Sequence, residues 1–213
     1  EVFPFRYCEI KSKNARLGTP LSIIRESAYY LFGETGKFES SNDILNQIWE
    51  LCRYSMKATS FCGIYVDGDR ERIPYEADAL INQLSHYAVD NEYSLARVSH
   101  EHLMTHATWP TEWILQSVLI AWNDYLYSGD ARSLRLFYTD LKAKTLLPLA
   151  DEETLFISTR TGKQTPDLLK SVHYYTGKEL RDIVDWPQAN SFGQDQKPGE
   201  SDFFVFKEVN SVV

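Results

Sequence analysis

Hydrophobic residues recur at helical spacing through most of the chain, and this pattern constrains the fold more than any other feature. A capping box at Ser40 and Asp43 predicts the start of a first helix. Further helices are predicted over residues 77–88, 92–106 and 114–126, each with apolar side chains on one face. The chain is therefore predicted to be mainly α-helical.

The same pattern continues toward the C-terminus. Gly129 predicts the end of the helix over 114–126, and more helices are predicted over residues 131–147, 166–174 and 178–184. Short links between successive helices make them antiparallel neighbours, which predicts helical hairpins. Several wide apolar faces indicate helices that are packed on both sides within a larger array.

The N-terminal part has a different pattern. Residues 2–10 alternate aromatic and polar side chains, and residues 21–32 form a second β-rich run that ends in turn residues. Two strands alone do not make a stable sheet. We therefore expect these strands to lean on the helices or to belong to a larger sheet.

Overall charge and hydropathy exclude two classes of partner. The formal net charge is −8, whereas a phosphate-binding surface must be basic, so a nucleic-acid partner is not expected. No apolar run approaches the roughly 20 residues that span a bilayer. Aromatic residues make up 14% of the chain, which suits either a large core or the binding of sugar faces. Neither the charge nor the apolar runs of the sequence distinguish a periplasmic or secreted protein from a cytoplasmic one.

Cysteine and histidine spacing predicts no metal site, and no cofactor is expected. Cys8, Cys52 and Cys62 are odd in number and widely spaced, so we interpret them as buried free thiols. His102 and His106 share a predicted helical face, but no carboxylate lies at the offset of a zinc motif. We interpret them as ordinary histidines.

Residues 66–78, VDGDRERIPYEAD, concentrate charge between an apolar run and a predicted helix. In an extended backbone, Asp67, Asp69 and Glu71 point to one side and Arg70 and Arg72 to the other. Such a carboxylate row can bind a hard cation, hold sugar hydroxyls, or supply a general acid. A calcium loop, a salt-bridged surface turn and a hydrolase site are all compatible with this stretch alone, although an EF-hand loop requires Gly where the arginine at 72 stands.

Tryptophans stand beside acids at predicted helix ends. Trp109 and Trp113 flank Glu112 at the start of one helix, and Trp186 follows Asp185 at the end of another. If these ends converge, they form a polar pocket with aromatic walls, in which acids bind hydroxyls and an indole covers the C–H face of a sugar. The sequence therefore favours a carbohydrate site.

Three segments carry a resemblance to a known family. GIYVDGDRERIPYEADA resembles the catalytic signature of the bacterial α-L-rhamnosidases of glycoside hydrolase family 78, and WPTEWILQSVLIAWNDYLYSGD and DIVDWP are similar to two later segments in the same order. The resemblance implies an (α/α)6 barrel of six helical hairpins, incomplete over residues 38–213. Residues 1–37 would then be a β-rich segment that ends an adjoining β-sandwich or links to it.

The resemblance also implies a function. It is the removal of terminal α-L-rhamnose from a rhamnose-containing oligosaccharide or glycoside with inversion at the anomeric carbon, and Glu71 is the implied general acid. The implied substrate-binding residues are Asp67, Arg70, Tyr75, Asp78, Trp113, Asp185 and Trp186.

This sequence departs from the family pattern at three points. The interval from Asp67 to Glu71 is one residue short, which makes Asp69 a rival for the role of Asp67. After Trp113 the usual Gly-Asp-Ala is absent, so the polar contact that the family makes there is expected from Glu112 or Gln116 instead. The general base is expected beyond Val213, which makes this chain a fragment that is inactive alone. The alternatives are a non-catalytic helical module that binds carbohydrate or serves as a scaffold, and a six-hairpin glycosidase for another sugar.

Overall fold

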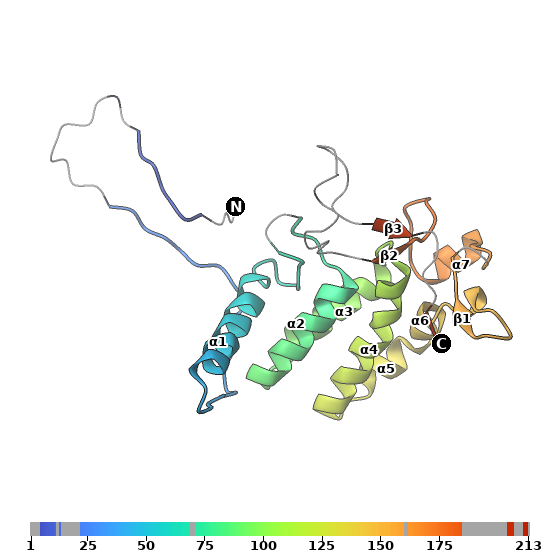
Figure 1. Cartoon of the computed structure of the whole chain (residues 1–213), viewed down its shortest axis with the longest axis horizontal. Helices are drawn as coiled ribbons and strands as arrows, with labels where there is room; N and C mark the ends of the chain where they lie inside the picture. Colours follow the sequence, from blue (N-terminus) through green and yellow to red (C-terminus); the bar gives the residue numbers. More distant parts are fainter. Residues whose placement is uncertain are drawn as a thin grey trace.

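The computed structural model describes residues 5–11, 13, 22–68, 71–159, 162–184, 204–206 and 211–212, and it is mainly helical (Figure 1). The helices are α1 (Asp43–Ala58), α2 (Glu76–Val89), α3 (Ser94–Thr105), α4 (Thr111–Ser128), α5 (Arg132–Leu136), α6 (Tyr138–Lys144), the 3-10 helix η1 (Leu147–Leu149) and α7 (Pro166–Ser171). Four short strands pair in two antiparallel ribbons, β1 (Phe156–Ile157) with β4 (Ser211–Val212) and β2 (Asp182–Val184) with β3 (Phe204–Phe206). The predicted mainly α fold is confirmed.

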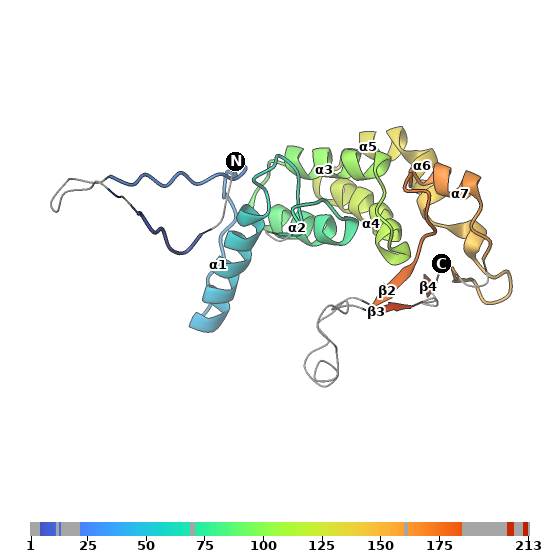
Figure 2. The same ribbon diagram turned by 90° about the horizontal axis from the view of Figure 1, so that it is seen from above.

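The helices lie in two rows. Figure 2 shows α2 and α4 side by side in one row and α3, α5 and α6 in the other. α4 contacts α2, α3, α5, α6 and β2, so it is the central helix of the array. Its apolar residues point to more than one neighbour, as the wide apolar face predicts. Within the described residues, no helix combines the length and apolar character needed to cross a membrane.

The helix ends show which local signals were correct. α4 ends at Gly129, which adopts the left-handed conformation at φ 68° as a C-terminal glycine should. The capping box predicted at Ser40 and Asp43 is wrong, because the cap of α1 is Asn42. Its side-chain oxygen accepts a hydrogen bond from the backbone N–H of Ile44 at 2.9 Å, while the Ser40 hydroxyl donates to the Asn42 carbonyl at 3.1 Å.

Two of the later helix predictions need correction. The single helix expected over 131–147 is broken at Phe137, which ends α5 and begins α6 and whose ring packs against the cluster of Met104, Ala121 and Leu141. A helix over 178–184 is also wrong. There the backbone bonds outward instead of within a helix, with Leu180 N–H donating to the Gln164 side chain at 2.7 Å, and the chain continues as β2.

The predicted N-terminal strands are wrong for the described residues, since 5–11 and 22–40 contain no strand. Only the part around residues 30–36 lies along the helices, where the ring of Phe32 enters the core beside α2 and α3, whereas residues 5–11 and 22–29 are exposed. Gly33 N–H donates to the Asp90 carboxylate at 2.5 Å, and Gly36 N–H donates to the Val89 carbonyl at 2.8 Å. Two backbone N–H groups just after the predicted second strand therefore bond to the C-terminal end of α2.

Gly36→Ala tests this attachment. A Cβ atom at position 36 would lie 2.4 Å from the Ala88 carbonyl oxygen and 2.7 Å from the Val89 Cα, so the segment must move away from α2. We expect a loss of about 1–3 kcal/mol in unfolding free energy and faster proteolysis near residue 36, measured on the full-length protein. The exposed neighbour gives the control, Lys37→Ala, and equal proteolysis of the two variants would contradict the attachment.

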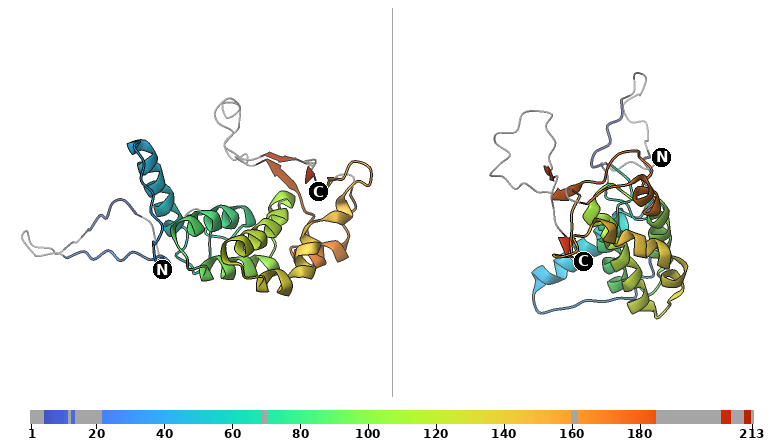
Figure 3. Two further views of the ribbon diagram at one scale, coloured as in Figure 1. Left: turned by 90° about the horizontal axis from the view of Figure 1, so that it is seen from below. Right: turned by 90° about the vertical axis from the view of Figure 1, so that its right-hand side faces the viewer.

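α1 is an edge helix with an open apolar face. Figure 3 shows it at one edge of the array, with α7 at the opposite edge. Of its residues only Met56 is buried. The exposed apolar residues of α1 are Ile44, Leu45, Ile48, Leu51 and Tyr54.

The prediction of buried thiols is wrong, because Cys8, Cys52 and Cys62 are free and exposed.

Candidate active site

The charged stretch forms the loop between α1 and α2. Its apolar flanks are buried as expected, with Tyr65 and Val66 each 1% exposed. Asp67 N–H donates to the Ile73 carbonyl at 3.0 Å, and Ile73 N–H donates to the Asp67 carboxylate at 3.1 Å. Arg72 has a φ of 59°, so the expected extended backbone with alternating sides is wrong at this residue. The loop is instead closed on itself by the hydrogen bonds between Asp67 and Ile73. One acid of the predicted carboxylate row, Asp67, therefore holds the loop closed.

Glu71 lies at the exposed surface of this loop. Its carboxylate accepts a hydrogen bond of 2.7 Å from the hydroxyl of Tyr75, the residue that caps the N-terminus of α2. Burial, and then the hydrogen bond to Glu71, raise the pKa of Tyr75 well above its usual value. The phenol therefore stays protonated and remains a donor to the carboxylate.

Tyr75 begins a row of aromatic rings. Its ring meets that of Trp113 edge to face at a centroid separation of 5.1 Å, and Trp113 contacts Trp109 at 6.5 Å. The guanidinium of Arg181 lies 4.5 Å from the centre of the Trp109 ring. We call Tyr75, Trp113 and Trp109 the aromatic row. It has a carboxylate at one end and a guanidinium at the other.

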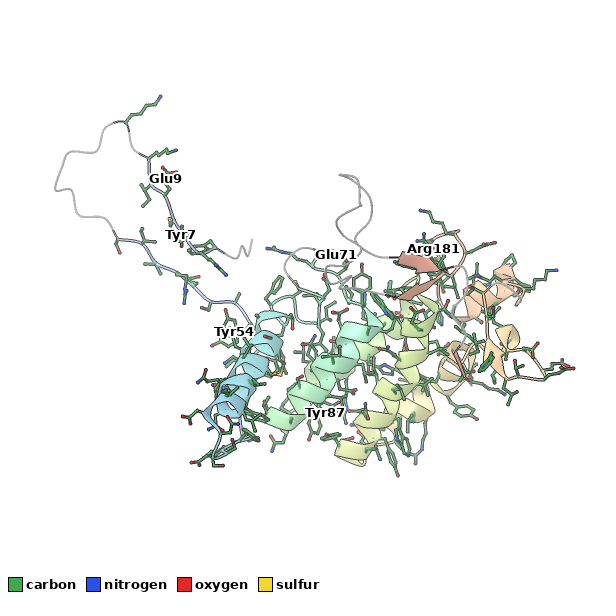
Figure 4. All side chains as sticks on the ribbon, viewed as in Figure 1. Tyr7, Glu9, Tyr54, Glu71, Tyr87 and Arg181 are labelled. Atoms are coloured by element: carbon green, nitrogen blue, oxygen red, sulfur yellow. The ribbon has the colours of Figure 1, made fainter. Side chains whose placement is uncertain are left out.

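The row lies at one end of the helical array. In Figure 4, Glu71 and Arg181 lie along the same edge, beside the N-terminal ends of α2 and α4, whereas Tyr87 marks the opposite end of α2. Trp113 is in the first turn of α4 and Trp109 just precedes it. The structure brings Trp109 and Trp113 close to Glu71 through the ring of Tyr75, and all three aromatic rings are half-buried. Convergence with the second predicted junction, at Asp185 and Trp186, stays a prediction.

The remaining predicted residues are placed as follows. Asp78 lies half-buried in the first turn of α2, and Glu112 half-buried in the first turn of α4. Arg70, Asp185 and Trp186 lie outside the described residues, and so does Asp69.

Glu76 is a residue to which sequence reasoning assigned no role. It is 0% exposed at the start of α2, and its carboxylate accepts hydrogen bonds from the Thr108 N–H at 3.1 Å and from the Thr108 hydroxyl. Burial raises the pKa of Glu76, while these bonds and the charge of Lys144 oppose the rise. Because Thr108 adjoins Trp109, Glu76 ties the entry of α4 to the turn that carries Tyr75. The only sequence signal is an acid directly after the capping tyrosine.

Lys144 is a second buried charge close to this contact. It is 0% exposed, and its ammonium donates to the carbonyls of Leu103 and Val172, each at 3.2 Å. Burial lowers the pKa of Lys144 to about 8. It joins α6 to the end of α3 and to the segment after α7.

The histidines have structural surroundings. His102 and His106 stack with ring centroids 4.4 Å apart, as their shared helical face predicts. His100 is buried edge-on against Phe137, and burial lowers its pKa to about 4. Within the described residues, no three His, Cys, Asp or Glu side chains group as a metal site.

A separate hollow of about 710 Å³ lies beside the loop, between α1 and the extended segment around residues 25–29. Gly68 and Arg72 line it, but Glu71 does not. The carboxylate at 71 therefore contacts the aromatic row and does not line this hollow.

Comparison with known proteins agrees with this arrangement. The sequence model of the bacterial alpha-L-rhamnosidase 6 hairpin glycosidase domain matches residues 33–197, which is most of the chain. The chain belongs to this family. The resemblance of the three motifs is thereby confirmed, and the domain is of a glycosidase type whose substrates are glycosides. No curated protein and no solved structure matches the chain.

Proposed function

We propose that the protein removes terminal α-L-rhamnose from glycosides by an inverting mechanism with Glu71 as the general acid. The contact of Glu71 with the aromatic row carries the proposal, because it places a carboxyl group beside aromatic rings that can hold a sugar. Tyr75 contributes both the hydroxyl that orients the carboxyl group and part of the apolar wall. Family membership supports the general reaction, which is hydrolysis of a glycosidic bond.

The proposed steps balance as follows. The protonated carboxyl of Glu71 gives its hydrogen to the glycosidic oxygen as the bond from that oxygen to the anomeric carbon breaks. A water molecule attacks the anomeric carbon from the opposite face and loses a proton to a second carboxylate. In inverting enzymes the two carboxyls stand about 6.5–9.5 Å apart to leave room for the water.

Substrate binding is assigned in keeping with these steps. The aromatic row covers the C–H face of the sugar, and Trp113 is the ring of the row that both neighbours share. Asp78 accepts hydrogen bonds from sugar hydroxyls. Asp67 binds the sugar in the same way, while its carboxylate also holds the loop that carries Glu71. Arg70, Asp185 and Trp186 keep the binding roles that the family resemblance implies.

The second carboxylate is proposed to lie on a helical hairpin that follows Val213. Residues 38–213 then form part of an (α/α)6 barrel, and residues 1–37 belong to an adjoining β-sandwich or its linker. The two rows of helices, one of them with α2 and α4 beginning at the same edge, support this architecture, because a ring of hairpins contains an inner and an outer row (Figure 2).

An aryl α-L-rhamnoside tests the function in the full-length protein. We expect aryl alcohol release from the rhamnoside and little from other aryl glycosides, with β-L-rhamnose as the first product in a time-resolved proton NMR experiment. α-L-rhamnose as the first product would contradict inversion. Hydrolysis of another glycoside alone would indicate a six-hairpin glycosidase for that sugar, and binding without hydrolysis would indicate a non-catalytic carbohydrate-binding module.

A further inference from the structure

The position of Glu71 decides where the leaving group of the substrate lies. The leaving group is attached through the glycosidic oxygen that Glu71 protonates, so it lies on the opposite side of that oxygen from the rhamnose. The rhamnose side is the aromatic row, which begins at Tyr75. In Figure 4, Glu71 lies between Arg181, at the far end of the row, and Tyr54 of α1. The leaving group therefore extends from Glu71 toward α1.

The hollow of about 710 Å³ lies on this side of Glu71, and Tyr54 forms part of its wall. The loop contributes Gly68 and Arg72 to the wall, and Arg72 directly follows Glu71 in the sequence. Residues 25–29 and α1 supply most of the rest. Pockets of about 300–1,000 Å³ hold ligands of drug size. The hollow therefore has room for more than one sugar residue.

Aromatic rings form the apolar part of the wall. They belong to Phe5, Tyr29, Tyr54 and Phe61. The Lys57 ammonium lies 4.6 Å from the centre of the Tyr29 ring. The Arg72 guanidinium lies 5.4 Å from the centre of the Phe61 ring. Tyr54 is 69% exposed, so a large part of its ring is open to a ligand. Such rings suit the C–H face of a sugar.

Polar side chains stand among these rings. They include Arg25, Glu26, Ser27, Glu50, Arg53 and Thr59. Arg53 donates to the Glu50 carboxylate at 3.1 Å, whereas Arg25 and Glu26 form no ion pair within the described residues. An aryl group would use the rings alone. A sugar residue offers hydroxyls to the polar side chains and its C–H face to the rings, so the wall favours a sugar.

We infer that the hollow between α1 and residues 25–29 is the leaving-group site and that it binds an oligosaccharide. The substrate class is then a terminal rhamnose on a chain of two or more further sugars, and not a rhamnosylated aryl group. This inference rests on the proposed function and specifies the leaving group of its substrate.

Three rhamnosides with leaving groups of increasing size test the inference in the full-length protein. They are methyl α-L-rhamnoside, rhamnose linked to glucose, and rhamnose linked in the same way to cellobiose. We expect kcat/KM of the wild type to rise along this series by roughly 3- to 10-fold for each aromatic ring that becomes covered. Tyr54→Ala should lower kcat/KM for the cellobiose substrate by a similar factor, mainly through KM, and change the methyl rhamnoside much less. Tyr54→Phe keeps the ring and should keep most of the preference.

A matched control and a fourth substrate separate the alternatives. Tyr138→Ala removes a tyrosine of α6 that is 68% exposed and outside the hollow, and it should leave all the rate ratios at their wild-type values. An equal loss on all three substrates in Tyr54→Ala would show that Tyr54 does not bind the leaving group, and the inference is then wrong. An equal loss on a naphthyl rhamnoside and on the cellobiose substrate would contradict the preference for sugars.

The wild type alone distinguishes failure of the inference from failure of the proposed function. Equal kcat/KM values for the methyl, glucose and cellobiose substrates overturn the inference and leave the proposed function standing. A wild-type protein that hydrolyses none of the rhamnosides overturns the proposed function, and the inference with it.

Discussion

Glu71→Gln in the full-length protein is expected to lower kcat on an alkyl α-L-rhamnoside by about 10²- to 10⁴-fold, the usual contribution of a general acid. Glutamine has nearly the same shape, and its carbonyl oxygen still accepts the Tyr75 hydrogen bond, but its amide cannot release a proton to the leaving oxygen. Steady-state kinetics measure the loss. A nitrophenyl leaving group needs less protonation, so its hydrolysis should fall less.

Two further variants separate proton donation from structure. Glu101→Gln removes an exposed acid of α3 away from the row and should keep wild-type kinetics. Tyr75→Phe keeps the ring against Trp113 and loses only the hydroxyl that contacts Glu71, so we expect a smaller loss than in Glu71→Gln. A folded Glu71→Gln protein with near wild-type turnover of both leaving groups would remove Glu71 from the mechanism.

Glu76→Ala is expected to lower the free energy of unfolding of the full-length protein by about 2–4 kcal/mol, because hydrogen bonds to a charged group contribute about 1.5–3 kcal/mol each and a buried cavity adds to the loss. Both bonds that Thr108 donates to the carboxylate would be absent. Urea unfolding followed by tryptophan fluorescence measures the change. Release of Thr108 should also loosen Trp109, so KM for a rhamnoside should rise.

Glu76→Gln is the matched variant, and it adds a pH signature. Burial raises the pKa of Glu76 above the 4.5 of an unfolded chain, so the folded state favours the protonated carboxyl. That contribution to stability is complete below pH 4.5 and is lost as the pH rises through the folded pKa. Glutamine keeps an acceptor for Thr108 and does not titrate. The stability of Glu76→Gln should therefore fall less than that of the wild type as the pH rises above 4.5. Parallel pH profiles would contradict the buried carboxyl.

Part of the candidate site was accessible from local sequence. The motif around residues 63–79 singled out Glu71 and Tyr75, and tryptophans next to acids singled out Trp113. These predictions depended on residue types at short spacing and on the resemblance, and the structure brings these three side chains into contact through the ring of Tyr75. The expected alternation of charges failed at Arg72, because the pairing of Asp67 with Ile73 turns the loop before the pattern ends.

Other parts of the site depend on residues far apart in the sequence. Arg181 reaches Trp109 only because the segment after α7 returns to the entry of α4, and Glu76 reaches Thr108 only because α2 and α4 pack side by side. Neither contact has a local sequence signal, since an arginine followed by an aspartate and an acid in a first helical turn both suit a solvated surface. The wrong prediction of a helix over 178–184 has the same cause, because the backbone of these residues bonds to other segments of the chain and not within a helix.

Helical periodicity was sufficient to place α2, α3 and α4, because an amphipathic segment of three or more turns shows which face is buried. Gly129 likewise marked the end of α4. Short or isolated segments were decided by tertiary contacts. The chain near Phe32 lies against α2 where the Phe32 ring enters the core, and the helix expected over 131–147 is broken at Phe137, whose half-buried ring packs against a core cluster. Burial of one large side chain outweighs the weak propensity of a few residues. Tertiary packing, and not the local pattern, therefore joins Glu71, the aromatic row and Arg181 along one edge of the molecule.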